Sequence, residues 1–408
     1  MRYNAFMDEI KDTKKTEIAV VGGGAGGMLC ALLLARAGRR VLLLERGERL
    51  GRKLSATGNG QGNVTNVALD ETHYFTDDRS KVASVLGAFS GNDLLDFFRS
   101  LGGLFSADER GRVYPTGRQA SAVTDLMRFA LARAGAQVRC NFFVKEIKRK
   151  NGQFVLSDGK EEYTAEYAVL ATGGKAGAHF GTDGNGYASA KSFGHTVTPL
   201  YPSLVQVKTE TEDIRSLKGI RADALVRAYD GEKFLKEERG DVLFTDYGVS
   251  GNAVFYLSAY LSGAKDPSLS LSFLPDCPKE AIGAAIKKRG EYLPKEEWLG
   301  CIVNNALGRA IVRRAKREGD GSAEQILSLV KDFRLKVTGT PGFDGAQVTK
   351  GGIPLSEVSE KMESKKRKNL FFCGEILNVD GECGGYNLQW AFSSGAVAAR
   401  EILQRSGR

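Results

Sequence analysis

Two short apolar runs near the start of the chain flank a segment with a helical pattern. Residues 18–21 read Ile-Ala-Val-Val and residues 41–44 read Val-Leu-Leu-Leu, whereas residues 25–36 are rich in alanine and leucine. Continuous apolar runs of this length are typical of strands that are buried on both faces. The pattern therefore predicts a strand, a helix and a second strand in a βαβ unit.

The turn between the first strand and the helix carries a glycine motif, Gly22-x-Gly24-x-x-Gly27, and Glu45 follows the second strand. Gly22 permits the tight turn, Gly24 lets the backbone approach a pyrophosphate, and Gly27 lets the helix pack on the strand. The pyrophosphate is expected at the helix N-terminus, with Ala25 and Gly26 in the first turn. Glu45 is expected to bind ribose hydroxyls, and its charge repels a 2′-phosphate. We interpret this unit as a dinucleotide-binding site.

A glycine-rich loop follows, with five glycines between Gly47 and Asn63. Loops of this length inside a compact domain are uncommon unless they are functional. We expect this one to wrap the rest of a long anionic cofactor; the alternative, a disordered loop, would more usually carry serine and proline. The candidate cofactor-binding residues here are Arg46, Gly51, Arg52, Lys53, Thr57, Gly58, Asn59, Gly60 and Asn63.

The next part of the chain predicts further elements of the same domain. Short helices are expected over residues 82–102, a hairpin over 104–115, a helix over 119–134, and strands over 137–148, 154–157 and 163–167. A buried strand from Ala168 then leads into a second glycine turn, which makes Thr172 and Gly173 cofactor candidates, together with Val144. A helix is expected to start near residues 183–185.

Beyond residue 195 the pattern changes to short strands at 198–207, 224–229, 241–245 and 268–273, without long helices between them. Residues 279–330 are then largely helical, with Arg309, Arg313, Arg314, Lys316 and Arg317 on one face, which we interpret as solvated. The expected division is a dinucleotide-binding domain over 1–195, a β-rich insert over 196–275, a helical insert over 276–335, and a return to the first domain over 336–408.

The C-terminal part predicts a second half of the ligand site. A strand over 370–373 ends in Gly374-Glu375, and the glycine turn Gly384-Gly385 begins a helix that runs to about residue 403. Glu375 is suited to polyol hydroxyls. The helix N-terminus at Tyr386, Asn387 and Leu388 suits an acceptor that becomes negative, such as the N1/O2 edge of a flavin. Two such half-sites indicate FAD rather than NAD.

Composition narrows the class of protein. The chain is 42% hydrophobic and 26% charged, and its 58 basic residues against 49 acidic ones give a net charge of +9. This charge suits an anionic ligand and leaves nucleic acid as the minority interpretation; the basic run at 365–368 is interpreted as a solvated turn. No run is long enough for a membrane span, and no secretory signal is evident. The six cysteines show no Cys-x-x-Cys and no zinc spacing, so we expect a cytoplasmic protein without a metal.

Several motifs together resemble a group of bacterial flavoproteins described as aminoacetone-oxidase-like, or as BaiN-like after a bile-acid-inducible member. They are residues 22–27, Gly51-Arg-Lys53, residues 57–60, Asn63-Val-Thr-Asn66, Val348-Thr-Lys-Gly-Gly352, Gly374-Glu375 and residues 384–390. The resemblance covers essentially the whole chain. It implies an α/β, glutathione-reductase-like FAD domain built from both ends of the sequence, interrupted by a β-barrel-like insert and a helical insert. One departure is Gln61-Gly62, where many relatives carry Arg-Cys.

The expected function is an FAD-dependent oxidoreductase that exchanges a hydride between the flavin and a small organic substrate. Transient NAD(P)H binding is left open as the electron source, because no second complete glycine motif occurs. Weak candidates for proton transfer or for contact with the flavin ring are Lys53, Tyr114, His179 and Tyr386. The alternatives are a flavoprotein that acts on tRNA or other RNA, and a non-catalytic flavin sensor.

Overall fold

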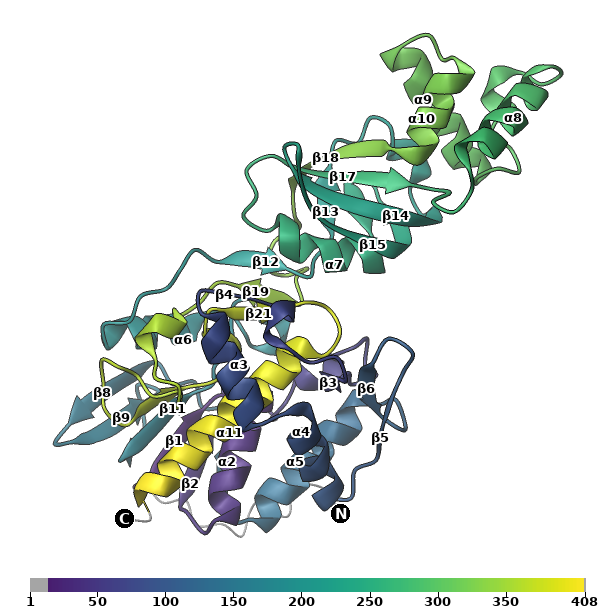
Figure 1. Ribbon diagram of the computed structural model, residues 1–408. Helices are drawn as coiled ribbons and strands as arrows, with labels where there is room; N and C mark the ends of the chain where they lie inside the picture. Colours follow the sequence, from purple (N-terminus) through teal and green to yellow (C-terminus); the bar gives the residue numbers. More distant parts are fainter. Residues whose placement is uncertain (1–13, 407–408) are drawn as a thin grey trace. The chain divides into compact units, whose positions relative to one another are not determined.

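The computed structural model describes residues 14–406, which form two compact units (Figure 1). Unit 1 comprises the residues up to Leu200 and those from Val348 onward, and unit 2 comprises Tyr201–Gln347. The return to unit 1 therefore comes later than residue 336, the boundary expected from the sequence. Residues 336–338 belong to the last barrel strand of unit 2.

A parallel sheet forms the centre of unit 1, with strand order β20-β11-β1-β2-β7. The bounds are Ile18–Val21 for β1, Val41–Leu44 for β2, Gln137–Arg139 for β7, Tyr167–Leu170 for β11 and Leu370–Phe372 for β20. Every residue of β1, β2, β11 and β20 is buried, which explains their uninterrupted apolar sequences. The predicted βαβ unit is confirmed, because helix α2 (Ala25–Arg36) follows β1 and leads to β2, which pairs with β1 in parallel.

Helix α11 (Tyr386–Ser406) packs against α2, and the two helices, one yellow and one purple, lie side by side in Figure 1. Glycines allow the close approach: a Cβ atom at Gly26 would lie 2.6 Å from the Ala391 carbonyl oxygen, and one at Gly395 would lie 2.4 Å from the Gly26 carbonyl oxygen. Met28, Leu29 and Leu32 of α2 are fully buried. Each such side chain contributes about 1.5–3 kcal/mol through burial.

The prediction of one strand over residues 137–148 is wrong. The chain leaves the parallel sheet after β7, because the amides of Asn141 and Phe142 donate to the carbonyls of Gly47 and Glu45, and Asn141 has a left-handed φ of 55°. It re-enters as β8 (Glu146–Lys150) in a separate antiparallel sheet of order β10-β9-β8. The two other strands of that sheet are β9 (Gln153–Ser157) and β10 (Glu162–Ala165).

The remaining elements of unit 1 surround the sheet. The helices are α3 (Arg79–Ala88), α4 (Gly91–Ser100), α5 (Ala120–Arg133) and α6 (Asn185–Ser192). The short strands are β3 (Thr65–Asn66), β4 (Tyr74–Thr76), β5 (Phe105–Ala107), β6 (Arg112–Pro115), β19 (Val348–Lys350) and β21 (Val379–Gly381). The predicted hairpin over 104–115 is present as β5 and β6.

Unit 2 contains a closed barrel of order β13-β16-β15-β14-β17-β18. The barrel strands are β13 (Val207–Thr209), β14 (Arg221–Asp230), β15 (Lys233–Phe244), β16 (Gly248–Ser250), β17 (Pro267–Ser272) and β18 (Phe333–Gly339). The other elements are β12 (Tyr201–Ser203) and helices α7 (Asn252–Leu261), α8 (Lys279–Gly290), α9 (Asn305–Glu318) and α10 (Ala323–Lys331). The sequence did not predict α7, whose valine, phenylalanine and tyrosines favour strands in isolation.

No helix within residues 14–406 is long and apolar enough to cross a membrane. The same part of the chain contains no group of three or more His, Cys, Asp and Glu side chains placed to hold a metal ion.

Candidate functional site

The first glycine turn has different surroundings at each glycine. Gly22 has φ of 105°, and a Cβ atom there would lie 2.4 Å from the Ala171 carbonyl oxygen. A Cβ atom at Gly27 would lie 2.0 Å from the Gly22 carbonyl oxygen, so this glycine is required for the helix to contact the strand. Nothing lies within 4 Å of a Cβ atom built at Gly24. The turn is therefore closed on its protein side and open at its middle glycine.

Helix α2 begins at this open position. Gly24 is its N-cap residue, no side chain caps the helix, and no acidic residue lies in its first turn. The first N–H groups of a helix have no partner within the helix. The amides of Ala25, Gly26 and Gly27 consequently present an uncapped positive helix end that suits a phosphate.

Glu45, at the end of β2, points back to the glycine turn. Its Oε2 atom accepts a hydrogen bond from the Gly23 amide at 2.8 Å, and its Oε1 atom accepts one from the Gly47 amide at 2.7 Å. Each carboxylate oxygen can accept a second hydrogen bond. The neighbouring Arg46 lies 2.7 Å from Asp183 and over the ring of Phe143, in the segment that leads to Val144. This arrangement can receive a nucleoside beside the turn.

Backbone hydrogen bonds, both within the loop and to neighbouring segments, order the loop over residues 51–63. The Gly51 amide donates to the Gly23 carbonyl, the Gly62 amide donates to the Thr57 carbonyl, and the Ala120 amide donates to the Gly60 carbonyl. Gly62 has φ of 80°, and a Cβ atom there would lie 2.9 Å from the Cα atom of Ala120. The departure at Gln61-Gly62 thus coincides with a close contact between the loop and the first residue of α5.

Lys53 connects this loop to the C-terminal half-site. Its Nζ atom lies 2.7 Å from Oε2 of Glu375 and 3.2 Å from the Ala176 carbonyl oxygen. Oε1 of Glu375 accepts a hydrogen bond from the Thr349 amide, and the Thr349 hydroxyl accepts hydrogen bonds from the amides of Lys175 and Ala176. Four separate segments of the sequence therefore meet at one partly buried ion pair, which we call the Lys53 cluster (Lys53, Lys175, Ala176, Thr349 and Glu375).

The glycine turn before α11 docks on β3 and β4. The Asn66 side chain donates to the Gly384 carbonyl at 3.0 Å, and the Tyr74 hydroxyl donates to the Tyr386 carbonyl at 2.9 Å. A Cβ atom at Gly385 would lie 2.4 Å from the Thr65 carbonyl oxygen.

Asn387 closes the same turn from within, since its side chain exchanges two hydrogen bonds with the backbone of Gly381. The first turn of α11, which includes Asn387 and Leu388, contains no acidic residue. The helix end is thus held rigidly, and it suits negative charge.

Tyr386 is the one weak catalytic candidate on this helix end. Its ring stacks on His73 with centroids 4.4 Å apart, and His73 Nδ1 lies 2.8 Å from Glu382. Burial raises the pKa of Tyr386 to about 12, so its phenol is protonated at neutral pH. His73 and Glu382 were not predicted from the sequence. His73 is one of only three histidines in the chain, and this rarity could have drawn attention to it.

The two other weak candidates, Tyr114 and His179, lie in separate surroundings. Tyr114 lies against the guanidinium of Arg118, 4.0 Å from the ring centroid, and burial raises its pKa. The ring of His179 packs on Phe180, and its carbonyl oxygen accepts a hydrogen bond from Arg52 at 2.7 Å. Arg52 and Lys53 both contact the 176–181 segment. Within residues 14–406, no hydrogen bond or ion pair joins Arg52 or Lys53 to Tyr386.

Two buried oxygen atoms test whether FAD suits this region. Oδ1 of Asn63 and Oγ1 of Thr172 are inaccessible to solvent and have no hydrogen-bond partner among the residues that the structure describes. Buried polar atoms are rarely left unpaired in proteins. Asn63 lies beside Gly385 in the C-terminal turn, and Thr172 follows β11 in the central sheet. Polar atoms that lack a protein partner, together with the open Gly24, fit a long polar cofactor.

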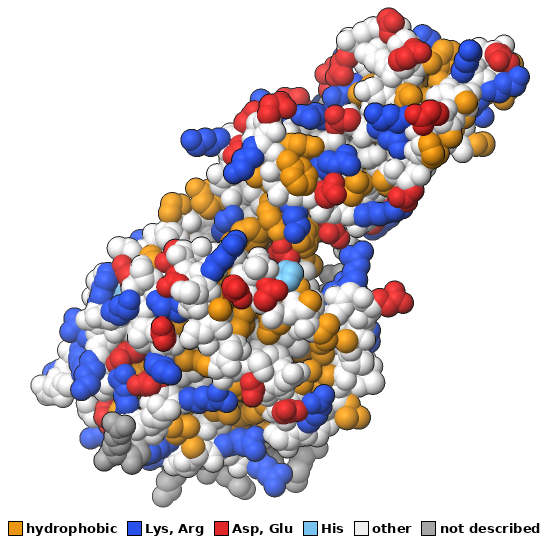
Figure 2. Space-filling view, viewed as in Figure 1, with side chains coloured by type: hydrophobic (Ala, Val, Ile, Leu, Met, Phe, Trp, Pro, Cys, Tyr) orange, Lys and Arg blue, Asp and Glu red, His pale blue; other side chains and the backbone are white. Residues whose placement is uncertain are grey.

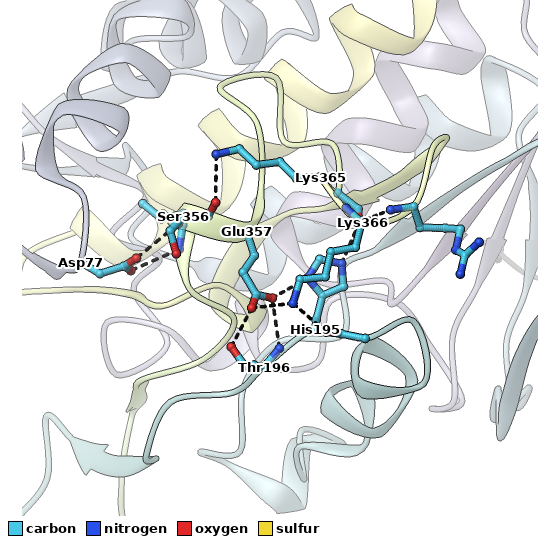
Figure 3. Close-up of polar contacts among 11 residues, drawn as sticks. Asp77, His195, Thr196, Ser356, Glu357, Lys365 and Lys366 are labelled. Atoms are coloured by element: carbon cyan, nitrogen blue, oxygen red, sulfur yellow. Dashed lines mark hydrogen bonds and ion pairs between the residues drawn. The ribbon is translucent and has the colours of Figure 1, made fainter.

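A different polar cluster, outside the two half-sites, has a structural role (Figure 3). The carboxylate of Glu357 contacts Nδ1 of His195 at 2.8 Å, Nζ of Lys366 at 2.7 Å, and both the amide and the hydroxyl of Thr196. These contacts lower the pKa of Glu357 to about 2, although partial burial opposes the shift. His195 is buried and also contacts Ser364, and its pKa is lowered by burial. The cluster ties residues 195–196 to the 357–366 segment.

The basic face of α9 is largely neutralised within unit 2. Arg309 pairs with Glu297, Arg314 with Glu318, and Arg317 with Asp213. Lys316 pairs with Glu296, while Arg313 donates to the Ser216 hydroxyl at 2.5 Å. Figure 2 also shows Lys and Arg side chains interspersed with Asp and Glu over the face in view. Arg309, Arg313, Lys316 and Arg317 are exposed, in agreement with the expectation of a solvated helix face.

The fold and the two glycine half-sites define a Rossmann-type, FAD-binding flavoprotein. Comparison with protein families agrees, since residues 16–401 match the model described as HI0933-like protein Rossmann domain. The chain belongs to this family, which confirms the resemblance to the BaiN-like flavoproteins. Membership implies FAD as the cofactor and makes the protein an FAD-dependent oxidoreductase.

Similar proteins of known activity include two with different substrates. The chain is 34% identical over 406 residues to the 3-dehydro-bile acid delta(4,6)-reductase of Clostridium scindens, covering 95% of this chain and 99% of the relative. It is 29% identical over 405 residues to the ribosomal RNA dihydrouridine synthase of Escherichia coli, covering 96% and 98%.

Among solved structures, the fold is similar to that of the 3-ketosteroid delta1-dehydrogenase of Sterolibacterium denitrificans in complex with 1,4-androstadiene-3,17-dione. The TM-score is 0.52 at 14% identity, and the match covers 96% of this chain and 100% of that one. At this identity the likeness shows the fold alone.

Proposed function

We propose that the protein is an FAD-dependent reductase that saturates a carbon–carbon double bond conjugated to a carbonyl group. The proposal rests on the chemistry that the reactions of two relatives have in common. A 3-dehydro bile acid with delta(4,6) unsaturation is a conjugated ketone. The uracil ring that becomes dihydrouracil has its reduced bond next to a carbonyl. Both reactions add a hydride to an electron-poor alkene.

Several described residues carry groups that suit FAD in this role. The α2 N-terminus would hold the pyrophosphate, Glu45 the adenosine ribose, and Glu375 the polyol hydroxyls, with Asn63 and Thr172 supplying buried acceptors. Bound FAD, once reduced by an electron donor, would supply the hydride. The amides at the start of α11 would stabilise negative charge on the flavin ring edge, and the hydrogen bonds of Asn387 hold those amides in position.

A small organic substrate is favoured over RNA by the charge distribution. RNA binding requires basic side chains that are available to neutralise phosphates. On α9, the most basic helix face, the cations pair with carboxylates of the same unit.

Ribosomal RNA is the second candidate substrate, because of the 29% identical relative and the net charge of +9. Incubation with reduced cofactor and unmodified ribosomal RNA, followed by nucleoside mass spectrometry, distinguishes the two substrate classes. Dihydrouridine in the product would establish RNA as the substrate and would contradict the assignment of a small molecule.

NAD(P)H is the proposed electron donor, bound transiently. The experiment is an anaerobic visible spectrum of the FAD-loaded protein, before and after NADH and then NADPH, followed by addition of a conjugated enone. We expect the flavin bands to bleach with a nicotinamide donor and to return with the enone, accompanied by the saturated product. Flavin that bleaches but is not reoxidised by any conjugated carbonyl compound would overturn the proposed function. Flavin that fails to bleach would remove NAD(P)H as donor.

A further inference from the structure

A cavity of about 380 Å³ lies on unit 1, beside the C-terminal half-site. Ligand sites in proteins commonly have volumes of about 300–1,000 Å³, so this space can hold a small molecule or one end of a larger one. Its lining includes Phe75, Arg79, Lys350, Asn378 and Asp380. None of these residues was predicted as a site residue from the sequence.

Lys350 is one of two cations that line this cavity, with Arg79. Its Nζ atom lies 4.7 Å from the centroid of the Phe75 ring. Strands β4 and β21 pair so that Asp380 is directly opposite Phe75, which places both side chains on the same face. Asp380 is almost completely buried and interacts electrostatically with Lys350. An aromatic ring and a carboxylate thus position one ammonium group against the cavity.

The environment of Lys350 favours donation of hydrogen bonds to a ligand. Burial lowers the pKa of its ammonium group, and the charge of Asp380 opposes that shift. A partly desolvated cation gains more from a new acceptor than one in water, because the local dielectric constant is lower. An ammonium group has three N–H donors, so it can contact a carboxylate and a ligand oxygen together.

Two residues that are adjacent in sequence to the cavity lining contact the two proposed halves of the cofactor site. Thr349, directly before Lys350, holds Glu375 in the Lys53 cluster. Gly381, directly after Asp380, exchanges hydrogen bonds with Asn387 in the first turn of α11. Successive residues of a strand point to opposite faces. Thr349 therefore faces the Lys53 cluster, while Lys350 faces the cavity.

We propose that this cavity binds the carbonyl end of the conjugated substrate and that Lys350 donates a hydrogen bond to the carbonyl oxygen. The proposal rests on the proposed function. Hydride addition to the β-carbon breaks the alkene π bond and moves its electron pair toward the carbonyl oxygen, where Lys350 stabilises the enolate. A proton from water then bonds to the α-carbon, and the reduced flavin is the two-electron reductant.

The test uses the full-length, FAD-loaded protein and 4-androstene-3,17-dione, a conjugated ketone, as the probe. Binding is followed through the change in flavin absorbance, and reduction is followed by product analysis. We expect Lys350→Met to weaken probe binding by about tenfold and to lower kcat by about 100-fold, since loss of one donor to a developing oxyanion costs this much. Lys350→Arg, which keeps the charge, should recover part of both. The control is Lys365→Met, because Lys365 is exposed and donates only to the Ser356 carbonyl among the contacts described.

A second measurement does not require a variant. Acetic anhydride labels lysines, and mass spectrometry reports the rate at each one. The probe should protect Lys350 in the wild-type protein and leave Lys365 unchanged.

The outcomes separate this proposal from the proposed function. Equal probe binding by Lys350→Met and wild type, without protection of Lys350, overturns the role of Lys350 even if the enone is reduced. Binding with protection but without reduction supports the cavity and contradicts the proposed function. Failure of the wild-type protein to bind the probe up to its solubility limit overturns the proposal.

Discussion

The ammonium of Lys53 and the carboxylate of Glu375 lie 2.7 Å apart although they are separated by 322 positions in the sequence. Their side chains are 25% and 19% exposed, so the pair is partly desolvated. The glycine-rich loop after β2 and the Gly-Glu turn after β20 are thereby fixed relative to each other. This ion pair joins the N-terminal and C-terminal parts of unit 1 at the proposed cofactor site.

Breaking the pair should destabilise unit 1 and weaken FAD binding. Lys53→Met leaves Glu375 with the Thr349 amide but without its cation, which should cost about 1–3 kcal/mol of unfolding free energy. A double-mutant cycle with Glu375→Gln should give a coupling energy of about 1 kcal/mol, measured by urea unfolding. Arg49→Met is the control, because the Arg49–Glu48 pair is highly exposed and 4.0 Å long. Additive effects of Lys53→Met and Glu375→Gln would contradict the coupling.

Gly27→Ala should destabilise the protein, since its Cβ atom would lie 2.0 Å from the Gly22 carbonyl oxygen. We expect a loss of at least about 2 kcal/mol and a lower FAD affinity, because the turn must shift. Gly87→Ala is the matched control. Gly87 lies within helix α3 with nothing within 4 Å of its added Cβ atom, so alanine should stabilise by about 0.5–1 kcal/mol. Thermal unfolding of both variants measures the contrast, and a Gly27→Ala protein as stable as wild type would refute it.

Glu45→Gln should weaken FAD binding by about tenfold or more. The amide keeps one oxygen but replaces the other with a donor, which then faces the amide of Gly23 or Gly47. Loss of a charge-assisted acceptor at this position costs about 1.5–3 kcal/mol. Fluorescence titration of the apoprotein with FAD measures the change, and Glu48→Gln, at an exposed neighbour, is the control. Equal affinities for the two variants would show that Glu45 has no part in binding.

Stability should fall in acid through the His195–Glu357 cluster. A lowered histidine pKa means that the unfolded chain binds the proton first, so stability falls as the pH drops below about 6.5. The lowered carboxylate pKa of Glu357 adds stability above its unfolded pKa, which is lost as the pH falls toward about 2. Glu357→Gln should therefore be less stable than wild type by about 1–3 kcal/mol at pH 7. The difference should disappear near pH 2. Urea unfolding at pH 7, 5 and 3 measures this, and a constant difference would contradict it.

Local patterns were sufficient to predict the central fold. The strand, glycine turn and helix over residues 18–36 depend on apolar periodicity and on glycine conformations, both of which are encoded within the segment itself. The C-terminal strand and helix were predicted for the same reason. Where tertiary contacts override local preference the prediction failed: α7 is rich in strand-forming residues, and the backbone contacts of Asn141 and Phe142 divide the strand predicted over 137–148.

The side-chain pairs of the site could not be predicted in this way. His73 contacts Glu382 across 309 positions, and neither residue lies in an α-helix or a β-strand. Lys350 was part of a recognised motif, but a sequence does not reveal that Asp380 is opposite Phe75. Such pairings depend on strand register between distant segments, which single-residue patterns do not contain.

The close packing of α2 on α11 has a consequence for synthesis of the protein. Gly26 and Gly395 contact each other, so the helix that would receive the pyrophosphate is supported by α11, which is synthesised long after it. During translation, helix α2 and strand β11 must wait for their C-terminal partners α11 and β20, whereas the barrel strands find theirs within a single continuous stretch of 201–347. We therefore expect FAD to bind only after α11 has been synthesised, and the N-terminal part of unit 1 to expose apolar surface until then.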